Sequence, residues 1–178
     1  MRRIALAAFL IFSVVLVSSA PYFNWIPMVS ATGTVRLLIT DPPKYSDNIT
    51  SITITFSQIA LNRVSPEGND TWIVLTNTSR TVDLMKVINV TESLGNFEVP
   101  AGNYPQIRFM ASNATAVINN ETVQLTIPSG DQTGLKVHFN SPLVISANIV
   151  TTVTIDITAD DKSIHNGKLV PSMSATFS

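Results

Sequence analysis

The 178-residue chain contains no cysteine, and only 13% of its residues are charged. Without thiols it can form neither a disulfide nor a thiolate metal site, and it has no cysteine nucleophile. The charged share is about half of what soluble proteins usually carry. Threonine, serine and asparagine take up the difference, and these residues suit strands and turns better than helices. The composition therefore predicts an all-β protein whose stability comes from an apolar core.

The N-terminus combines two arginines with an apolar run. Arg2 and Arg3 precede Ile4–Val17, fourteen residues without a charge and with Ser13 as their only polar member. A run of this length is typical of the apolar part of a signal peptide, whereas a bilayer span needs about 20 residues. We expect export, with residues 1–19 as the signal peptide and an extracellular or cell-surface location. The alternatives are cleavage after Ala20 or Ala31, and an uncleaved anchor.

Cationic surface is scarce in the mature chain. Without Arg2 and Arg3 it keeps nine basic and twelve acidic residues, a formal charge of −3. Nucleic acids and anionic membranes are bound through clusters of lysine and arginine. We therefore expect no nucleic-acid partner, and membrane contact only during export.

Motifs for catalysis or cofactor binding are also missing. No G-x-S-x-G nucleophile elbow and no glycine-rich phosphate loop occurs. His165 lies near Asp160 and Asp161, but this spacing matches neither a zinc signature nor a calcium loop. His138 falls on the outward face of an expected strand. We expect no catalytic residues, no metal, no cofactor and no enzymatic activity.

Alternating apolar residues mark the first two strands. Thr34–Thr40 alternates cleanly, and Asp41-Pro42-Pro43 then ends the strand. In Ile49–Arg63 the apolar residues switch parity between Phe56 and Ile59. Because a strand has a period of two, this switch requires an inserted residue, and we expect a β-bulge or a crossover near Ser57-Gln58.

Roughly ten short strands follow one another with turn signals about every 8 to 12 residues, which is typical of an antiparallel sandwich. Asn119-Asn120 predicts a two-residue hairpin turn, because asparagine tolerates positive φ. Residues 85–94 are expected to hold the only helical turn. We predict a single all-β, antiparallel β-sandwich over residues 32–178, Ig-like or pilin-like, preceded by a signal peptide and an apolar tail over residues 20–31.

Two aromatic residues have structural interpretations. Tyr104, shortly after Gly102, is placed like the tyrosine that ties a sandwich corner to the backbone. Trp72 begins an apolar strand, and we expect it in the core; stacking on a sugar is its alternative role.

Several segments together resemble a known family. They are T-G-T-V-R-L-L-I-T-D-P-P, I-T-S-I-T-I-T-F-S-Q-I-A-L-N-R, W-I-V-L, T-V-D-L-M-K-V, V-P-A-G-N-Y-P-Q-I-R-F and I-D-I-T-A-D-D-K-S-I. Their order and spacing, from about Gly33 to Pro171, resemble the secreted β-sandwich family catalogued as domain of unknown function 4382. The most specific piece is Pro100–Arg108. The resemblance implies a β-sandwich on exported proteins and no catalytic role. In size, signal, sequons and apolar tail the chain also resembles, more loosely, glycosylated archaeal thread pilins joined by donor-strand complementation.

Acceptor motifs for N-glycosylation are frequent. Asn-X-Ser/Thr without a central proline occurs at six positions, most of them in expected turns or at strand ends. There a bulky glycan can project into solvent, although turn-forming asparagine is the simpler explanation. We expect N-linked glycans on several of Asn48, Asn69, Asn77, Asn89, Asn113 and Asn120.

An apolar octet, residues 22–29, precedes the first strand. Its large side chains are Tyr22, Phe23, Trp25, Ile26, Met28 and Val29. Left in water they favour aggregation, so we expect them on the chain's own domain, at a membrane surface or in a neighbouring subunit. Insertion into a neighbour, repeated head to tail, makes a fibre. The sequence thus favours a non-enzymatic homopolymer, an extracellular filament subunit with an adhesive or structural role. The alternative is a monomeric secreted module that binds carbohydrate.

Overall fold

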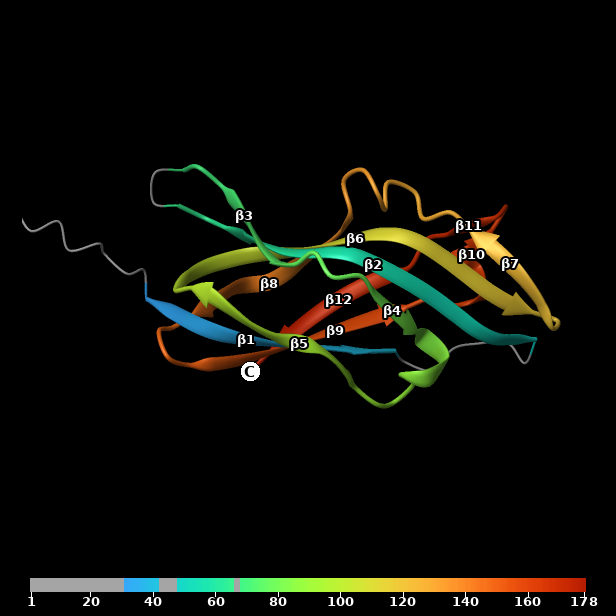
Figure 1. Cartoon of the computed structure of the whole chain (residues 1–178), viewed down its shortest axis with the longest axis horizontal. Coiled ribbons are helices and arrows are strands. Elements are labelled where there is room, and N and C mark those ends of the chain that lie inside the picture. Colours follow the sequence, from blue (N-terminus) through green and yellow to red (C-terminus); the bar gives the residue numbers. More distant parts are fainter. Residues whose placement is uncertain (1–30, 42–47, 66–67) are drawn as a thin grey trace, which may run out of the picture.

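The computed structural model describes residues 31–41, 48–65 and 68–178, and in them the chain forms two β-sheets packed face to face (Figure 1). Sheet I has the strand order β12-β9-β1-β5. Sheet II has the order β3-β2-β6-β7, with β4 also paired to β2 and β8 also paired to β6. The predicted all-β sandwich is therefore confirmed.

The strands of sheet I come from both ends of the chain. They are β1 (Thr32–Thr40), β5 (Glu92–Pro100), β9 (Val150–Thr158) and β12 (Ser172–Phe177). The strands of sheet II are β2 (Ile49–Arg63), β3 (Thr71–Thr76), β4 (Arg80–Asp83), β6 (Gly102–Ile118), β7 (Glu121–Leu125) and β8 (Leu135–Ile145). A small hairpin and two 3-10 turns complete the described chain: β10 (Ile164–His165), β11 (Lys168–Leu169), η1 (Leu84–Lys86) and η2 (Asp161–Ser163).

The first strand lies in the middle of its sheet. β1 pairs antiparallel with β5 on one side and parallel with β9 on the other. The sandwich is therefore not purely antiparallel, which the alternation of apolar residues could not indicate, because both kinds of strand have a period of two. β1 also begins at Thr32, two residues earlier than expected.

The parity switch in β2 is a β-bulge, as predicted. The register of β2 against β6 shifts between Thr55 and Phe56 and again between Phe56 and Gln58. Phe56 and Ile59 both reach the core, with 1% of each exposed. The extra residue lets one long strand bury apolar residues of both parities.

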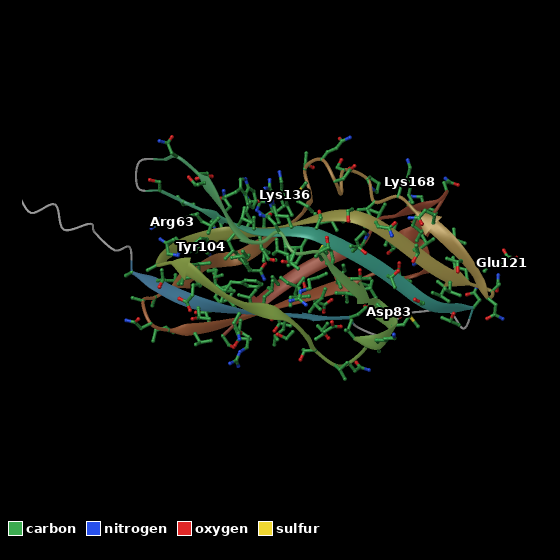
Figure 2. All side chains as sticks on the ribbon, viewed as in Figure 1. Arg63, Asp83, Tyr104, Glu121, Lys136 and Lys168 are labelled. Carbon is green, nitrogen blue, oxygen red and sulfur yellow. The ribbon has the colours of Figure 1, made fainter. Side chains whose placement is uncertain are left out.

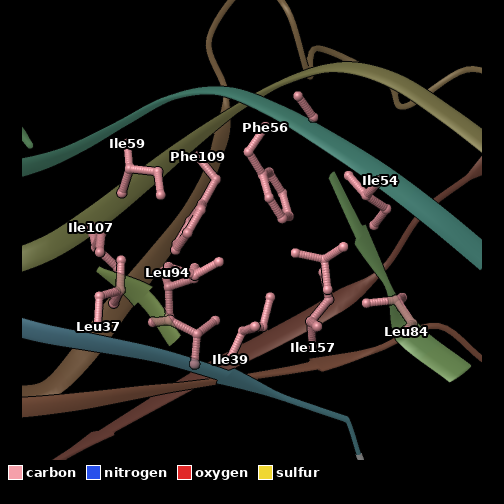
Figure 3. Close-up of a cluster of buried hydrophobic side chains, with 14 of the residues drawn as sticks. Leu37, Ile39, Ile54, Phe56, Ile59, Leu84, Leu94, Ile107, Phe109 and Ile157 are labelled. Atoms are coloured by element: carbon pink, nitrogen blue, oxygen red, sulfur yellow. The ribbon is translucent and has the colours of Figure 1, made fainter. Parts of the chain in front are cut away.

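The core lies between the two sheets and is almost entirely aliphatic (Figure 3). β1 contributes Leu37 and Ile39 from below in this view, and β2 and β6 contribute Phe56 and Phe109, whose ring centroids are 5.2 Å apart. Because the chain lacks cysteine, this core supplies most of the stability, at about 25 cal/mol per Å² of apolar surface buried.

Tyr104 ties a corner of the sandwich, as the sequence suggested. Its side chain is fully buried, and Oη donates a hydrogen bond of 2.6 Å to the carbonyl oxygen of Pro100. Burial raises the pKa of Tyr104, so the hydroxyl stays protonated and remains a donor. The bond joins the start of β6 in sheet II to the end of β5 in sheet I.

Local turn predictions have mixed outcomes. Asn119 and Asn120 have φ of 51° and 64° and form the two-residue hairpin between β6 and β7, as predicted. Helical turns occur at both η1 and η2, so the expectation of a single one was wrong.

The prediction that Trp72 lies in the core was also wrong. Trp72 is opposite Asn62 in the β2–β3 ladder, and its partly exposed ring stacks against Arg108 on the outer face of sheet II. In β3 the inward positions belong to Ile73 and Leu75, which pack against the core.

Replacing Tyr104 by phenylalanine tests the corner. The ring volume is kept and only the hydroxyl is lost, so Tyr104→Phe should lower the free energy of unfolding by about 1 to 3 kcal/mol, because the carbonyl of Pro100 loses its donor. Urea unfolding followed by circular dichroism measures the change. An unchanged midpoint would show that the hydrogen bond contributes nothing net, and Tyr104→Leu provides the comparison for lost ring packing.

Candidate functional site

All six sequon asparagines are exposed, but they are distributed unevenly. Asn48 precedes β2, Asn69 and Asn77 flank β3, Asn113 lies in β6, and Asn120 lies in the β6–β7 turn. Thus five of them border or belong to sheet II. The sixth, Asn89, lies between η1 and β5, and none lies within the four strands of sheet I.

Two acceptor asparagines are held by neighbouring side chains. Gln58 Nε2 donates to Asn77 Oδ1 at 2.9 Å, and Gln124 Nε2 donates to Asn113 Oδ1. Both bonds use the amide oxygen, whereas a glycan attaches to Nδ2. The amide is therefore oriented without its reactive nitrogen being used.

The predicted donor residues Tyr22, Phe23, Trp25, Ile26, Met28 and Val29 lie outside the described residues. The described chain begins at Ala31, at one end of the sandwich (Figure 1). There Ala101 N donates to Ala31 O at 2.7 Å, and Asn148 N donates to Thr32 O at 2.8 Å. The start of β1 is thus held between the β5–β6 and β8–β9 turns.

That end of the sandwich also exposes apolar side chains. Val144, Ile149 and Val150 are 59%, 54% and 53% exposed. All three lie at or beside the β8–β9 turn, next to the point where the chain enters β1. This end is therefore more apolar than a freely solvated tip needs to be.

β12 is an edge strand without a single charged residue, with the sequence S-M-S-A-T-F. Ser178 and Thr152 exchange both backbone hydrogen bonds. Because such pairs alternate along an antiparallel ladder, the backbone amides of Met173, Ala175 and Phe177 point away from β9, toward the outer edge. These three side chains face inward but are only partly covered, and Phe177 remains 38% exposed where its ring meets Phe139 of β8 edge-on, with centroids 5.7 Å apart.

Other edge strands of the described chain carry features that discourage pairing. β5 contains Glu92 and Glu98, and β7 and β8 contain Glu121 and Lys136. Charged residues on an edge oppose the addition of another strand. β3 has no charge, but the sequons Asn69 and Asn77 stand at its two ends.

Arg108 and Trp72 form a contact that the sequence pattern does not indicate. The Arg108 guanidinium lies 4.2 Å from the centroid of the Trp72 ring. Arg108 comes from β6 and Trp72 from β3, with β2 between them. The alternation around Ile107 and Phe109 places Arg108 on the outer face, but only the strand order reveals which aromatic residue it meets.

Asp41 is the second group that the sequence did not single out. It is 1% exposed at the end of β1, and burial, together with the nearby Asp156 carboxylate on β9, raises its pKa to about 7. Thr40 is level with Asp156 in the parallel β1–β9 ladder, which explains the proximity of the two acids. Nothing in the Asp41-Pro42-Pro43 segment alone indicates it.

Two small hollows open on the described surface, of about 220 and 250 Å³. The first lies between β6 and β7 and includes Asn113 and Asp131; the second lies at the end of the β2–β3 hairpin and includes Arg63 and Asn69. Nowhere in the described ranges do three or more His, Asp or Glu residues gather as metal ligands. Asp160 instead caps η2 by accepting from the backbone N–H of Ser163 at 2.9 Å.

A comparison with known families matches residues 32–170 to the domain of unknown function DUF4382. The chain belongs to the DUF4382 family. The matched region begins with β1 and includes every described strand except β12, in agreement with the limits expected from the sequence. No curated protein matches this DUF4382 chain. In the part of the chain that the structure describes, no helix is long and apolar enough to cross a bilayer.

The buried acid predicts a pH-dependent stability. The folded DUF4382 domain holds the Asp41 proton more tightly than the unfolded chain, in which the pKa is near the ordinary 3.8. The contribution is therefore fully present below about pH 4 and is lost as pH rises toward 7. The loss should amount to a few kcal/mol.

Asp41→Asn should flatten this profile, and urea midpoints measured between pH 4 and 8 will show it. Asp156→Asn removes only the neighbouring charge, so it should lower the pKa of Asp41 and make the decline smaller without abolishing it, because burial still raises that pKa. A wild-type profile that is flat over this range would contradict the assignment.

Proposed function

We propose that this DUF4382 protein is an exported, N-glycosylated, non-enzymatic subunit of an extracellular surface filament. Each subunit donates its apolar octet, residues 22–29, to the outer edge of β12 in the next subunit. The observation that carries the proposal is β12 itself, an uncharged edge strand whose Met173, Ala175 and Phe177 are only partly covered. An added strand would bond to the outward amides and cover these side chains.

The domain cannot pair the whole octet with its own β12. Phe177 is level with Val153 of β9, which is level with Leu37 of β1. Leu37 lies about 20 Å along β1 from Ala31, and the outer edge of β12 lies about 14 Å to the side, three strand spacings from β1. Val29 precedes Ala31 by only two residues, which span at most about 7 Å. Only a second molecule can bring the octet alongside β12.

Donor and acceptor also agree in length and polarity. The octet has eight residues and β12 has six. Neither contains a charged residue, so pairing them buries no unpaired charge. Pro27 lacks an N–H and fits a donor strand whose other side is open to solvent. Because donor and acceptor are different surfaces, the contact is heterologous, and it produces a fibre when the rotation between neighbours does not close a ring.

The uneven sequons support the same assignment. Glycans on Asn48, Asn69, Asn77, Asn113 and Asn120 would cover sheet II and its turns, whereas the strands of sheet I carry no acceptor. A filament subunit needs one surface free of bulky sugars for its neighbours. Sheet I borders one acceptor, Asn89, whose N–H bonds to Asp41 O at the end of β1, and the edge at β12, two strands away from β1, has that property.

Two complementary variants test the assembly. Deleting residues 20–30 removes the donor and keeps Ala31, which accepts from Ala101 N, and Ala175→Pro removes an outward N–H from the acceptor without removing a bond to β9. Each variant alone should be monomeric and folded, because the ladder and the core are kept. Mixed together they should form one-to-one dimers, since one still accepts and the other still donates. Analytical ultracentrifugation and electron microscopy measure these states, with Ala175→Val as the control that should still polymerise.

The outcome that contradicts the proposal is equally specific. Filaments formed by either variant alone would exclude the octet or β12, respectively, as the contact. If only the deletion variant polymerises, β1 (Thr32–Thr40) becomes the exchanged strand. Recovery of native protein solely as a monomer that begins at Thr32 would reject the donor role of the octet.

A second candidate function is a secreted carbohydrate-binding module, because Trp72 is partly exposed on the outer face of sheet II beside Arg108. Glycan-array binding that is lost in a folded Trp72→Ala variant would favour it. Filaments on sheared cell-surface material, with the octet at the N-terminus of the subunit, would favour the structural role.

A further inference from the structure

We propose that a glycan on Asn77 lies back along the outer face of sheet II, over Val74 and against the ring of Trp72. The inference rests on the N-glycosylation in the proposed function but not on filament assembly. In this proposal the Trp72–Arg108 contact is the intramolecular binding site of the glycan on Asn77.

The first step is the position of Asn77. It follows Thr76, the last residue of β3, and its Oδ1 accepts from Gln58 Nε2 at 2.9 Å. Gln58 lies on β2, opposite Met110 of β6. Asn77 is therefore fixed beside the sheet by a strand that it does not belong to, and a sugar attached to it begins over the outer face.

The second step is the continuity of polar and aromatic groups from this point. Gln58 Oε1 accepts from Arg108 Nη2 at 3.5 Å, and the Arg108 guanidinium lies 4.2 Å from the Trp72 ring centroid. Arg108 is opposite Lys136, which Figure 2 labels on this side of the molecule. Amide, guanidinium and indole groups thus line a path from Asn77, and a sugar can meet them with its hydroxyls and with its apolar C–H face.

The third step concerns polar atoms beneath this surface. Asn62 Oδ1 and Arg108 Nε are buried and have no hydrogen-bond partner, and Asn62 is only 2% exposed. A buried polar atom without a partner costs about 1 to 3 kcal/mol. Both atoms have almost no solvent-accessible surface, so a sugar over this face meets them only if the Trp72–Arg108 stack shifts, and its hydroxyls would then donate to the oxygen and accept from the N–H.

The fourth step is reach. Trp72 and Val74 share the outer face of β3, and Thr76, beyond a register shift at Leu75, is four residues from Trp72, about 13 Å along the strand. A short oligosaccharide covers this length. Val74, which lies between them, is 45% exposed and gains cover as the sugar passes over it. The sugar would also shield β3, an edge strand without charge.

The experiment compares the exported glycoprotein with a variant that lacks one sequon. Ser79→Ala removes glycosylation at Asn77 but keeps the Asn77 amide and its bond to Gln58. A Trp25→Phe background leaves Trp72 as the only tryptophan. Acrylamide quenching of Trp72 should rise about twofold or more in Ser79→Ala, because one face of the indole becomes accessible. Thr122→Ala, which removes the sequon at Asn120 on the distant hairpin, should leave quenching unchanged.

Glycopeptide mass spectrometry of the same samples separates the outcomes. An occupied Asn77 with raised quenching in Ser79→Ala supports packing of the glycan against Trp72. An occupied Asn77 with equal quenching, or an unglycosylated Asn77 beside other occupied sequons, rejects packing of the glycan against Trp72. Either result leaves the filament proposal untouched. If no sequon is occupied, both the packing of a glycan against Trp72 and the glycosylation in the proposed function are rejected. The β12 assembly experiments do not depend on this result.

Discussion

The position of β1 in the middle of sheet I is the constraint on which the rest of the structure depends. β5 lies on one side of β1, and β9 and β12 lie on the other, so β1 alone connects them within the sheet. The strand also fills the core with Val35, Leu37 and Ile39, all completely buried. Because β1 is held at its start by backbone bonds to Ala101 and Asn148, the preceding chain must leave from that end of the sandwich. In the proposed assembly, this fixes the point at which the donor segment joins its own domain.

Stability in this cysteine-free chain depends on a few polar groups as well as on the core. Tyr104 links the two sheets through the carbonyl of Pro100, and Asp41 remains buried beside Asp156 in a form that favours a bound proton. Both groups stand where β1 or its neighbour β5 ends. Polar interactions therefore stabilise the ends of the central strand, where apolar packing stops. Because Asp41 is protonated at low pH, the stability of the end of β1 depends on pH.

Local features of the fold could be predicted because they arise from neighbouring residues. Alternation identified the buried faces, the parity switch at Ser57-Gln58 identified the bulge, and Asn119-Asn120 identified a turn that needs positive φ. The parallel β1–β9 pair, the meeting of Arg108 with Trp72 and the proximity of Asp41 to Asp156 depend on strand order. Strand order joins residues far apart in the sequence, and alternation contains no information about it. For the same reason, the sequence revealed an apolar octet but not the edge that could receive it.

The edges of the two sheets suggest why the proposed assembly has a single direction. β3 and β12 are both edge strands without charge, so both could in principle accept a strand. β3 is flanked by the exposed sequons Asn69 and Asn77, and sugars at these positions would block its edge as charged residues block other edges. β12 has no such neighbour among the strands of sheet I. Glycosylation would then leave one acceptor for one donor, and a subunit with one of each joins its neighbours head to tail in a single direction.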